Sequence, residues 1–259
     1  MKSFKEYITI LYTYWDTPQN FFENSLKKAV EHNVNIIIIN DQSSDEYYQL
    51  LLQTVKKISK LNKDITITIV NAPFKLMQEG ATYYGTFFIN TPYTIRVDSD
   101  DILEYIPNLK IFQKDFDIAT SRENTPYSLI DYYKFFKSSI NGNIIRTELL
   151  RFLYADWEFM KKYHHVFPED LFTTLRRLLL LPELKIEFFE PPNYFRKKRA
   201  DSESSKKINF NLNHRKYQLL SILLTRYKFP EIDYLDNIQL FERNHNRTKN
   251  YKRNKLYKG

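Results

Sequence analysis

The chain has 259 residues, of which 42% are hydrophobic and 27% charged, and its formal net charge is +8. This length suffices for one large α/β domain or two small ones, and no apolar run approaches the roughly 18 to 20 residues that span a bilayer. The absence of cysteine excludes disulfide bonds, thiolate metal sites and a cysteine nucleophile. Residues 1–7 are too polar for a signal peptide, so we expect a cytoplasmic protein.

Apolar segments alternate with helix-like segments in the first part of the chain. The predicted strands cover residues 7–14, 34–39, 65–70 and 93–97. The first predicted helix begins at Pro18, after a polar cap at Asp16 and Thr17. Two further helices are predicted at residues 45–61 and 75–90. This alternation is typical of an α/β fold with a Rossmann-like, mostly parallel sheet flanked by helices, in which ligands bind at the carboxyl ends of the strands.

Beyond residue 117 the alternation loosens. Strand-like segments cover residues 116–121, 143–146 and 184–189, and helices are predicted at 147–153, 169–181 and about 211–228. No internal repeat and no Gly/Ser-rich linker interrupts the chain. We therefore interpret residues 1–240 as a single domain.

Residues 241–259 form a basic tail. They hold seven Lys or Arg against one acidic residue, Glu242, and so carry six of the eight net positive charges. Such a tail is either a solvated terminus or a contact to anionic lipid headgroups at the inner membrane face, or to nucleic acid.

The acidic cluster Asp98-Ser99-Asp100-Asp101 follows the fourth predicted strand. Three carboxylates in four residues repel one another unless a cation or several donors compensate. Mg²⁺ and Mn²⁺ prefer oxygen ligands and bridge carboxylates to phosphate oxygens. The cluster therefore predicts a metal site at a strand end. The alternative is an acidic turn in which Asp101 caps a helix that begins at Ile102.

Three motifs together resemble the family 2 glycosyltransferases of the GT-A fold: Asp41 after the second strand, the cluster at residues 98–101, and Glu169-Asp170 further along. The resemblance covers about residues 8–205. It implies a nucleotide-sugar donor, for which we expect a UDP-sugar, together with Mn²⁺ or Mg²⁺ and an acceptor hydroxyl. It also implies a nucleotide-sugar half, about residues 1–115, and an acceptor half, about residues 116–240.

The resemblance assigns donor-binding roles to five side chains. Asp41 corresponds to the aspartate that bonds uracil, although its loop would also serve simply to cap the next helix. Asp98 corresponds to the carboxylate that faces the ribose or the metal, and Asp100 to the direct metal ligand. Thr13 lies at the end of the first strand among the implied donor contacts. Gln78 replaces the amide of the family's Arg-Asn-x-Gly signature, whose arginine is lost here.

Two further motifs carry the implied chemistry. Asp170, preceded by Glu169, corresponds to the general base of an inverting transfer; the alternative is a helix N-terminus that begins after Pro168. The loop at residues 194–202 corresponds to the segment that closes over the diphosphate. Its Arg196 and Arg199 would offset charge on the leaving group, and the alternative is a solvated basic turn.

The expected function is sugar transfer in surface glycan or polysaccharide synthesis, onto a glycan, a lipid-linked sugar or a protein. A modified nucleic acid base is an alternative acceptor, to which the tail would supply phosphate affinity. A nucleotidyltransferase would normally have a glycine-rich phosphate loop after the first strand, and residues 11–17 contain no glycine. A basic nucleic-acid-binding protein is the non-enzymatic alternative.

Overall fold

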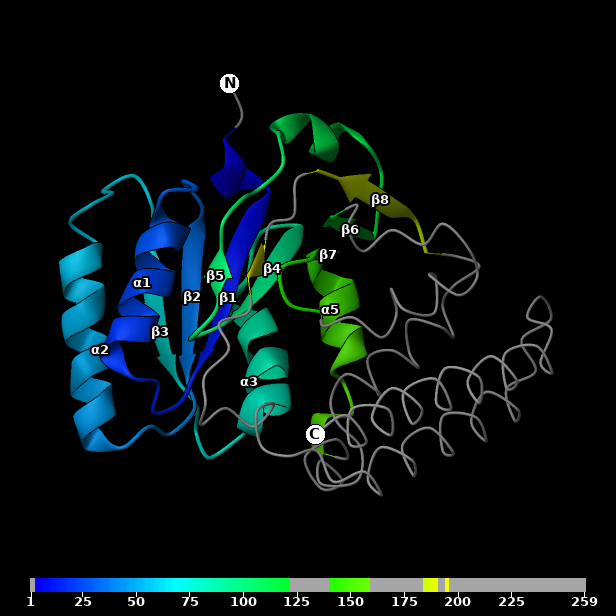
Figure 1. Ribbon diagram of the computed structural model, residues 1–259. Coiled ribbons are helices and arrows are strands. Elements are labelled where there is room, and N and C mark those ends of the chain that lie inside the picture. The colour runs from blue at the N-terminus through cyan, green and yellow to red at the C-terminus, as the bar shows by residue number, and fades with distance from the viewer. Residues whose placement is uncertain (1–2, 122–139, 159–183, 191–193, 196–259) are drawn as a thin grey trace, which may run out of the picture. The chain divides into compact units, whose positions relative to one another are not determined.

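The computed structural model describes residues 3–121, 140–158, 184–190 and 194–195 (Figure 1). The chain divides into two compact units, Met1–Ser205 and Lys206–Gly259, and every described residue belongs to the first. The predicted helices at 169–181 and 211–228 and the basic tail lie outside the described residues. In the part of the chain that is described, no helix has the length and apolar character needed to cross a bilayer.

A seven-stranded sheet forms the centre of the first unit, in the order β3-β2-β1-β4-β7-β6-β8. Its strands are β1 (Ile8–Tyr14), β2 (Asn35–Asn40), β3 (Ile67–Asn71), β4 (Tyr93–Asp98), β6 (Ile118–Ser121), β7 (Ile144–Arg146) and β8 (Ile186–Phe189). Every pairing is parallel except the two that β7 makes with β4 and β6. The prediction of a mostly parallel sheet is confirmed.

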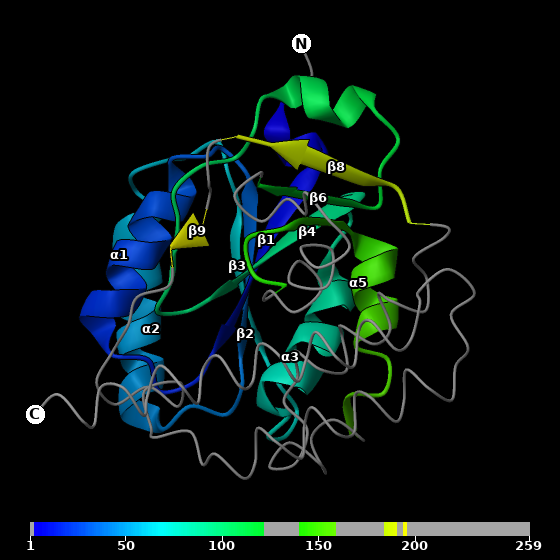
Figure 2. The ribbon, with the colours of Figure 1, turned by 45° about the vertical axis from the view of Figure 1, so that its right-hand side comes forward.

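Helices cover both faces of this sheet (Figures 1 and 2). The helices are α1 (Gln19–Val30), α2 (Asp45–Ile58), α3 (Met77–Gly85) and α5 (Thr147–Leu153). Side chains of β1 alternate between the faces, so Tyr12 packs in the core with Leu26 of α1, and Leu11 packs with Ala81 of α3. The α1–α2 layer and the α3–α5 layer therefore each bury one face of the strands.

The third helix is shorter than predicted. It begins at Met77 rather than at residue 75, because the Leu76 backbone N–H donates to Asp41 and the Lys75 side chain reaches the same residue. It ends at Gly85 and gives way to the 3₁₀ turn η2 (Thr86–Phe88). A Cβ atom at Gly85 would lie 2.6 Å from Leu11 Cδ1, so this glycine lets α3 approach β1 closely.

Asp16 and Asp101 do not cap helices in the way the sequence suggested. Asp16 adopts a left-handed backbone, with φ of 40°, and accepts a hydrogen bond from the Ser44 N–H at 2.9 Å, while Pro18 itself is the N-cap of α1. No helix begins at Ile102. Instead the two-residue strand β5 (Ile102–Leu103) pairs antiparallel with β9 (Tyr194–Phe195).

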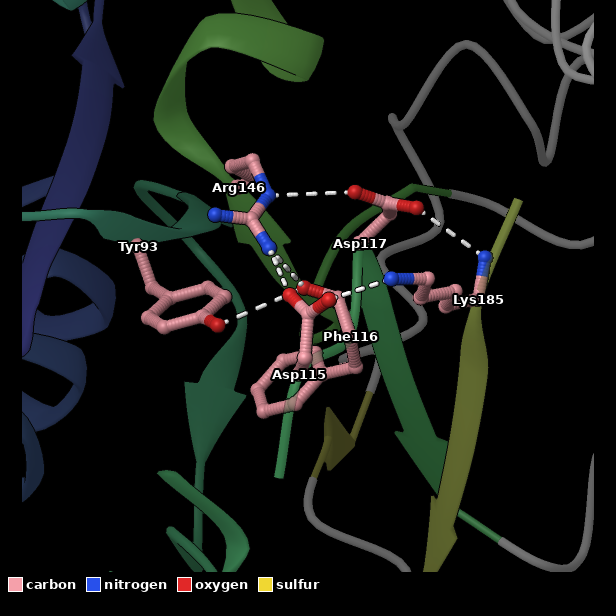
Figure 3. Close-up of polar contacts among 6 residues, drawn as sticks. All are labelled: Tyr93, Asp115, Phe116, Asp117, Arg146 and Lys185. Atoms are coloured by element: carbon pink, nitrogen blue, oxygen red, sulfur yellow. Dashed lines mark hydrogen bonds and ion pairs between the residues drawn. The ribbon is translucent and has the colours of Figure 1, made fainter. Parts of the chain in front are cut away.

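An ion-pair cluster joins β7 to the segments that precede β6 and β8 (Figure 3). Arg146, at the end of β7, contacts Asp115 at 2.8 Å and Asp117 at 3.0 Å. Lys185 pairs with Asp115 through its ammonium group and donates its backbone N–H to Asp117 at 3.0 Å. Because Arg146 pairs in register with Tyr93, the first residue of β4, the cluster lies at the amino-terminal edge of β4.

Candidate functional site

The predicted donor-binding residues gather at the opposite edge of the sheet. Asp98 is the last residue of β4 and Asp41 follows β2 directly. Thr13 of β1 pairs in register with Asp98 on the neighbouring strand. Strand β7 runs the other way, so Asn141, which precedes it, comes to this same edge. The topology thus brings polar side chains from four segments to the carboxyl ends of the parallel strands.

Backbone strain concentrates at this edge. Four non-glycine residues of the described chain have positive φ, and three of them lie here: Asp16 at 40°, Gln42 at 57° and Met77 at 62°. A left-handed conformation costs a non-glycine residue about 1 to 2 kcal/mol, and such costs persist where the surrounding structure enforces them, often at binding sites. The surrounding structure therefore enforces unfavourable backbone conformations next to the predicted site residues.

The Asp98 carboxylate is the centre of a hydrogen-bond network. Its Oδ1 accepts from Gln78 Nε2 at 2.5 Å and from Arg96 Nη2 at 3.2 Å. Its Oδ2 accepts from Asn141 Nδ2 at 2.7 Å. Arg96 is buried, and its Nη1 also donates to the Tyr154 hydroxyl at 2.7 Å. Both carboxylate oxygens are therefore held by donors from α3, β4 and the segment before β7.

The turn that follows Asp98 is tied to α1 and to the segment that precedes it. The Asp101 N–H donates to the Asp98 carbonyl at 3.0 Å, and the Asp101 carbonyl accepts from the Ser25 hydroxyl. The hydroxyls of Ser99 and Thr17 lie 2.5 Å apart. Asp101 is buried at 2% exposure, whereas Asp100 is half-buried. Asp100 is thus the more exposed of the two carboxylates that the turn adds to Asp98.

Asp41 is buried, and each oxygen of its carboxylate has a partner. Its Oδ1 accepts from the Leu76 N–H at 2.6 Å, and its Oδ2 lies 3.2 Å from Lys75 Nζ. Lys75 also donates to the Asp41 carbonyl at 2.8 Å. The Lys75 ammonium lies 3.7 Å from the centre of the Trp15 ring, and Trp15 is 57% exposed. An anion, a cation and an aromatic surface therefore meet between the ends of β1 and β2.

Several of these residues were not identified as site residues from the sequence alone. Arg96 stands between Ile95 and Val97 in a predicted strand, and a basic residue at such a position is a signal that could have been used. Asn141, Tyr154 and Lys75 belong to no local motif. Only the fold brings Asn141 to Asp98, Tyr154 to Arg96 and Lys75 to Asp41. Four predicted site residues lie outside the described residues: Glu169, Asp170, Arg196 and Arg199.

Gly80, the glycine of the Arg-Asn-x-Gly-like segment, serves packing in this structure. A Cβ atom at this position would lie 2.5 Å from Trp157 Cε3 and 3.0 Å from Leu76 Cβ. It therefore allows α3 to contact the segment that follows α5.

The described carboxylates suit a metal ion only in company with substrate oxygens. Within the described ranges, no group of three or more His, Asp or Glu side chains could hold a metal ion. Asp98 accepts three N–H donors and Asp101 is buried, whereas Asp100 is half-buried and so the more accessible of the turn's two carboxylates to a metal ion. One carboxylate together with substrate phosphate oxygens is a donor set that Mg²⁺ accepts in proteins.

Neither a protein-family model nor a curated protein matches the sequence. Among solved structures, residues 1–349 of S. aureus TarS in complex with UDP-GlcNAc are 14% identical, and the match covers 87% of this chain and 68% of that chain with a TM-score of 0.55. Another structure of S. aureus TarS is 13% identical over 91% of this chain and 42% of that chain, with a TM-score of 0.51. The sheet order, the flanking helices and these similarities together show that the chain has the GT-A fold of glycosyltransferases.

Proposed function

We propose that this protein transfers a sugar from a nucleoside diphosphate sugar to an acceptor hydroxyl. The observation that carries the proposal is the short segment at the start of α3. Its Lys75 and Leu76 bind Asp41, and its Gln78 binds Asp98. The two carboxylates that the resemblance assigns to the base and the ribose are thereby linked through four consecutive residues, at the edge where α/β sheets bind ligands.

The donor we propose is a UDP-sugar. In this assignment Asp41 accepts the imide N–H of uracil, Asp98 binds the ribose, and Thr13 and Gln78 add polar contacts. The similarity to TarS, which was solved in complex with UDP-GlcNAc, supports testing that donor first. The exposed ring of Trp15, beside Asp41 and Lys75, offers a surface on which a base can stack.

We assign the direct metal contact to Asp100, with Asp98 beside it. When bound, Mn²⁺ or Mg²⁺ would neutralise charge on the diphosphate leaving group. Arg196 and Arg199 would add positive charge at the same place. These side chains thus favour departure of the diphosphate.

The transfer we propose inverts the configuration at the anomeric carbon of the donor sugar. Asp170, with Glu169 beside it, removes the proton from the acceptor hydroxyl, and the hydroxyl oxygen forms a bond to the anomeric carbon. The bond from that carbon to the diphosphate oxygen breaks on the opposite face, and its electron pair leaves with the diphosphate. The acceptor we propose is a hydroxyl of a surface glycan, a lipid-linked sugar or a protein.

The test is hydrolysis of a nucleotide-sugar panel. UDP-GlcNAc, UDP-glucose, UDP-galactose and GDP-mannose are each incubated with the full chain and Mn²⁺ or Mg²⁺, and the released nucleoside diphosphate is measured. We expect slow release from a UDP-sugar, and loss of that release in Asp170→Asn with donor binding retained. If the chain neither binds nor hydrolyses any of these donors with either metal, the proposed function is wrong.

A further inference from the structure

Arg96 is a charged residue in the interior of the α3–α5 layer. It occupies the middle of β4, and its side chain is 1% exposed. A buried cation is unfavourable unless paired and hydrogen-bonded, so its presence in an apolar strand requires compensating partners. Because its side chain is buried, we take any effect of the guanidinium on substrate to pass through those partners.

One of these partners is Asp98. Residues two apart on a strand point to the same face, which places Arg96 Nη2 3.2 Å from Asp98 Oδ1. The other amino group is fixed by the Tyr154 hydroxyl at 2.7 Å, and Tyr154 is fully buried directly after α5. The guanidinium is therefore anchored in the core at one end and presented to Asp98 at the other.

The backbone of Arg96 acts on Asp98 by a second route. The Arg96 carbonyl accepts the Gly142 N–H at 2.9 Å, and Gly142 has φ of 78°, which favours glycine. This bond fixes the position of the adjacent Asn141, whose Nδ2 lies 2.7 Å from Asp98 Oδ2. Position 96 therefore constrains both oxygens of the carboxylate: the arginine side chain contacts Oδ1 directly, and the backbone carbonyl acts on Oδ2 through Gly142 and Asn141.

Asp98 stands at the boundary between this buried network and the exposed edge. Its side chain is 21% exposed, whereas that of Arg96 is 1% exposed. The inner side of the carboxylate meets Arg96 and Asn141, and its exposed part can be reached from the carboxyl edge. A ligand that binds Asp98 thus meets a carboxylate whose orientation has been fixed in advance, which lowers the entropic cost of binding.

We propose that Arg96 is a positioning residue for donor binding: it touches no part of the nucleotide sugar and acts by fixing the orientation of Asp98, with Asn141 as its second point of contact. This inference rests on the proposed function, because it takes Asp98 to be a donor-binding carboxylate. It adds that the affinity for the nucleotide depends on an arginine in the core.

A double-mutant cycle tests the inference without any turnover. UDP binding in the presence of Mn²⁺ is measured by calorimetry for the wild-type chain, Arg96→Met, Asp98→Asn and the double variant. We expect each single variant to bind UDP about 10- to 100-fold more weakly, as for loss of a hydrogen bond to a charged group. Because Arg96 acts through Asp98, the double variant should bind no more weakly than Asp98→Asn alone. Additive losses would overturn the inference.

Arg151→Met is the matched control. Arg151 lies on α5, donates to the Thr86 carbonyl at 2.9 Å and stacks over Phe87, so its loss removes an arginine from the same layer without touching Asp98. Its UDP affinity should equal that of the wild-type chain. A loss as large as that of Arg96→Met would show a general structural effect and overturn the inference.

A milder variant covers the case in which Arg96→Met does not fold. Tyr154→Phe removes the hydroxyl that fixes Arg96 Nη1 and keeps the ring in place, and its effect on UDP affinity should likewise vanish in the Asp98→Asn background. Persistence of the effect there overturns the inference. A wild-type chain that binds no nucleoside diphosphate overturns the proposed function, and the inference with it, whereas wild-type binding with additive losses overturns the inference alone.

Discussion

Lys75 binds two oxygen atoms of a single residue, the carbonyl and one carboxylate oxygen of Asp41. Replacing it by methionine leaves a buried carboxylate that still accepts a hydrogen bond from the Leu76 N–H but has lost its lysine. We expect Lys75→Met to lower the free energy of unfolding by about 1 to 2 kcal/mol, in the range of one hydrogen bond to a charged group, since Lys75 is itself a third exposed. Asp41→Ala should cost more, because it also frees the Leu76 N–H.

Urea denaturation of both variants measures these costs. Lys27→Met, on the exposed face of α1, is the control for loss of a lysine and should leave the urea midpoint unchanged. Equal midpoints for Lys75→Met and Lys27→Met would show that the Lys75 ammonium contributes nothing to the stability of the folded chain.

Gly80 lies where α3 meets the Trp157 ring. Alanine is the better helix former by about 1 kcal/mol, but its Cβ would lie 2.5 Å from Trp157 Cε3. Overpacking of this kind costs about 1 to 3 kcal/mol, so we expect Gly80→Ala to lower the melting temperature. In a Trp157→Ala background the same substitution should be neutral or stabilising. A wild-type melting temperature for Gly80→Ala alone would contradict this account of the glycine.

Among the elements, β6, β7 and β8 are joined by ion pairs and hydrogen bonds of Arg146 and Lys185 with Asp115 and Asp117. The hydrogen bond from Lys185 holds the pKa of Asp115 below its usual range, and Asp115 in turn raises the pKa of Lys185. A lowered carboxyl pKa contributes stability that is present above about pH 4, the unfolded value, and is lost as the pH falls through the folded pKa. A raised lysine pKa contributes stability that is present below about pH 10 and is lost as the pH rises through the folded value.

The expected result is a pH-dependent effect of Asp115→Asn. At about pH 6 the variant should have a lower urea midpoint than the wild-type chain, and the difference should shrink toward about pH 3. Added salt should also shrink it, because both side chains are exposed. Asp64→Asn, in an exposed loop, serves as the control. A difference that stays constant from pH 6 to about pH 3 would exclude the ion pair as its cause.

The strands that could be predicted are those with long apolar runs. Strands β1, β2 and β4 are buried on both faces, so their sequences differ sharply from the polar loops around them. The two-residue strand β5 pairs with residues about 90 positions away, and no local pattern encodes such a pair. The start of α3 was misplaced because a tertiary contact to Asp41 overrides the local helix preference of Lys75 and Leu76.

The same division holds for the site. Asp41 and Asp98 follow apolar strands, and a parallel sheet necessarily brings such strand ends to one edge. Asn141 reaches that edge because β7 is antiparallel to β4, and no sequence pattern predicts that change of strand direction. The carboxylates could thus be predicted, whereas the groups that orient them could not.

At the scale of the whole molecule, the sheet separates two kinds of charge cluster. The amino-terminal edge of β4 carries ion pairs between Arg146, Lys185 and their aspartates (Figure 3). The carboxyl edge carries Asp98 and Asp100, with Arg96 compensating the first of them from the core. In the proposed function, a metal ion that binds Asp100 balances part of the negative charge of that edge.

This balance predicts that metal and nucleotide bind cooperatively. A single carboxylate binds Mn²⁺ weakly, and the diphosphate adds the missing oxygen ligands. We therefore expect UDP to tighten Mn²⁺ binding and, by reciprocity, Mn²⁺ to tighten UDP binding by the same factor. Calorimetry of each ligand with and without the other measures that factor. Asp100→Ala should reduce it to about one while leaving metal-free UDP binding in place, since Asp41 and Asp98 remain. A coupling factor unchanged by Asp100→Ala would assign the metal contact to another residue.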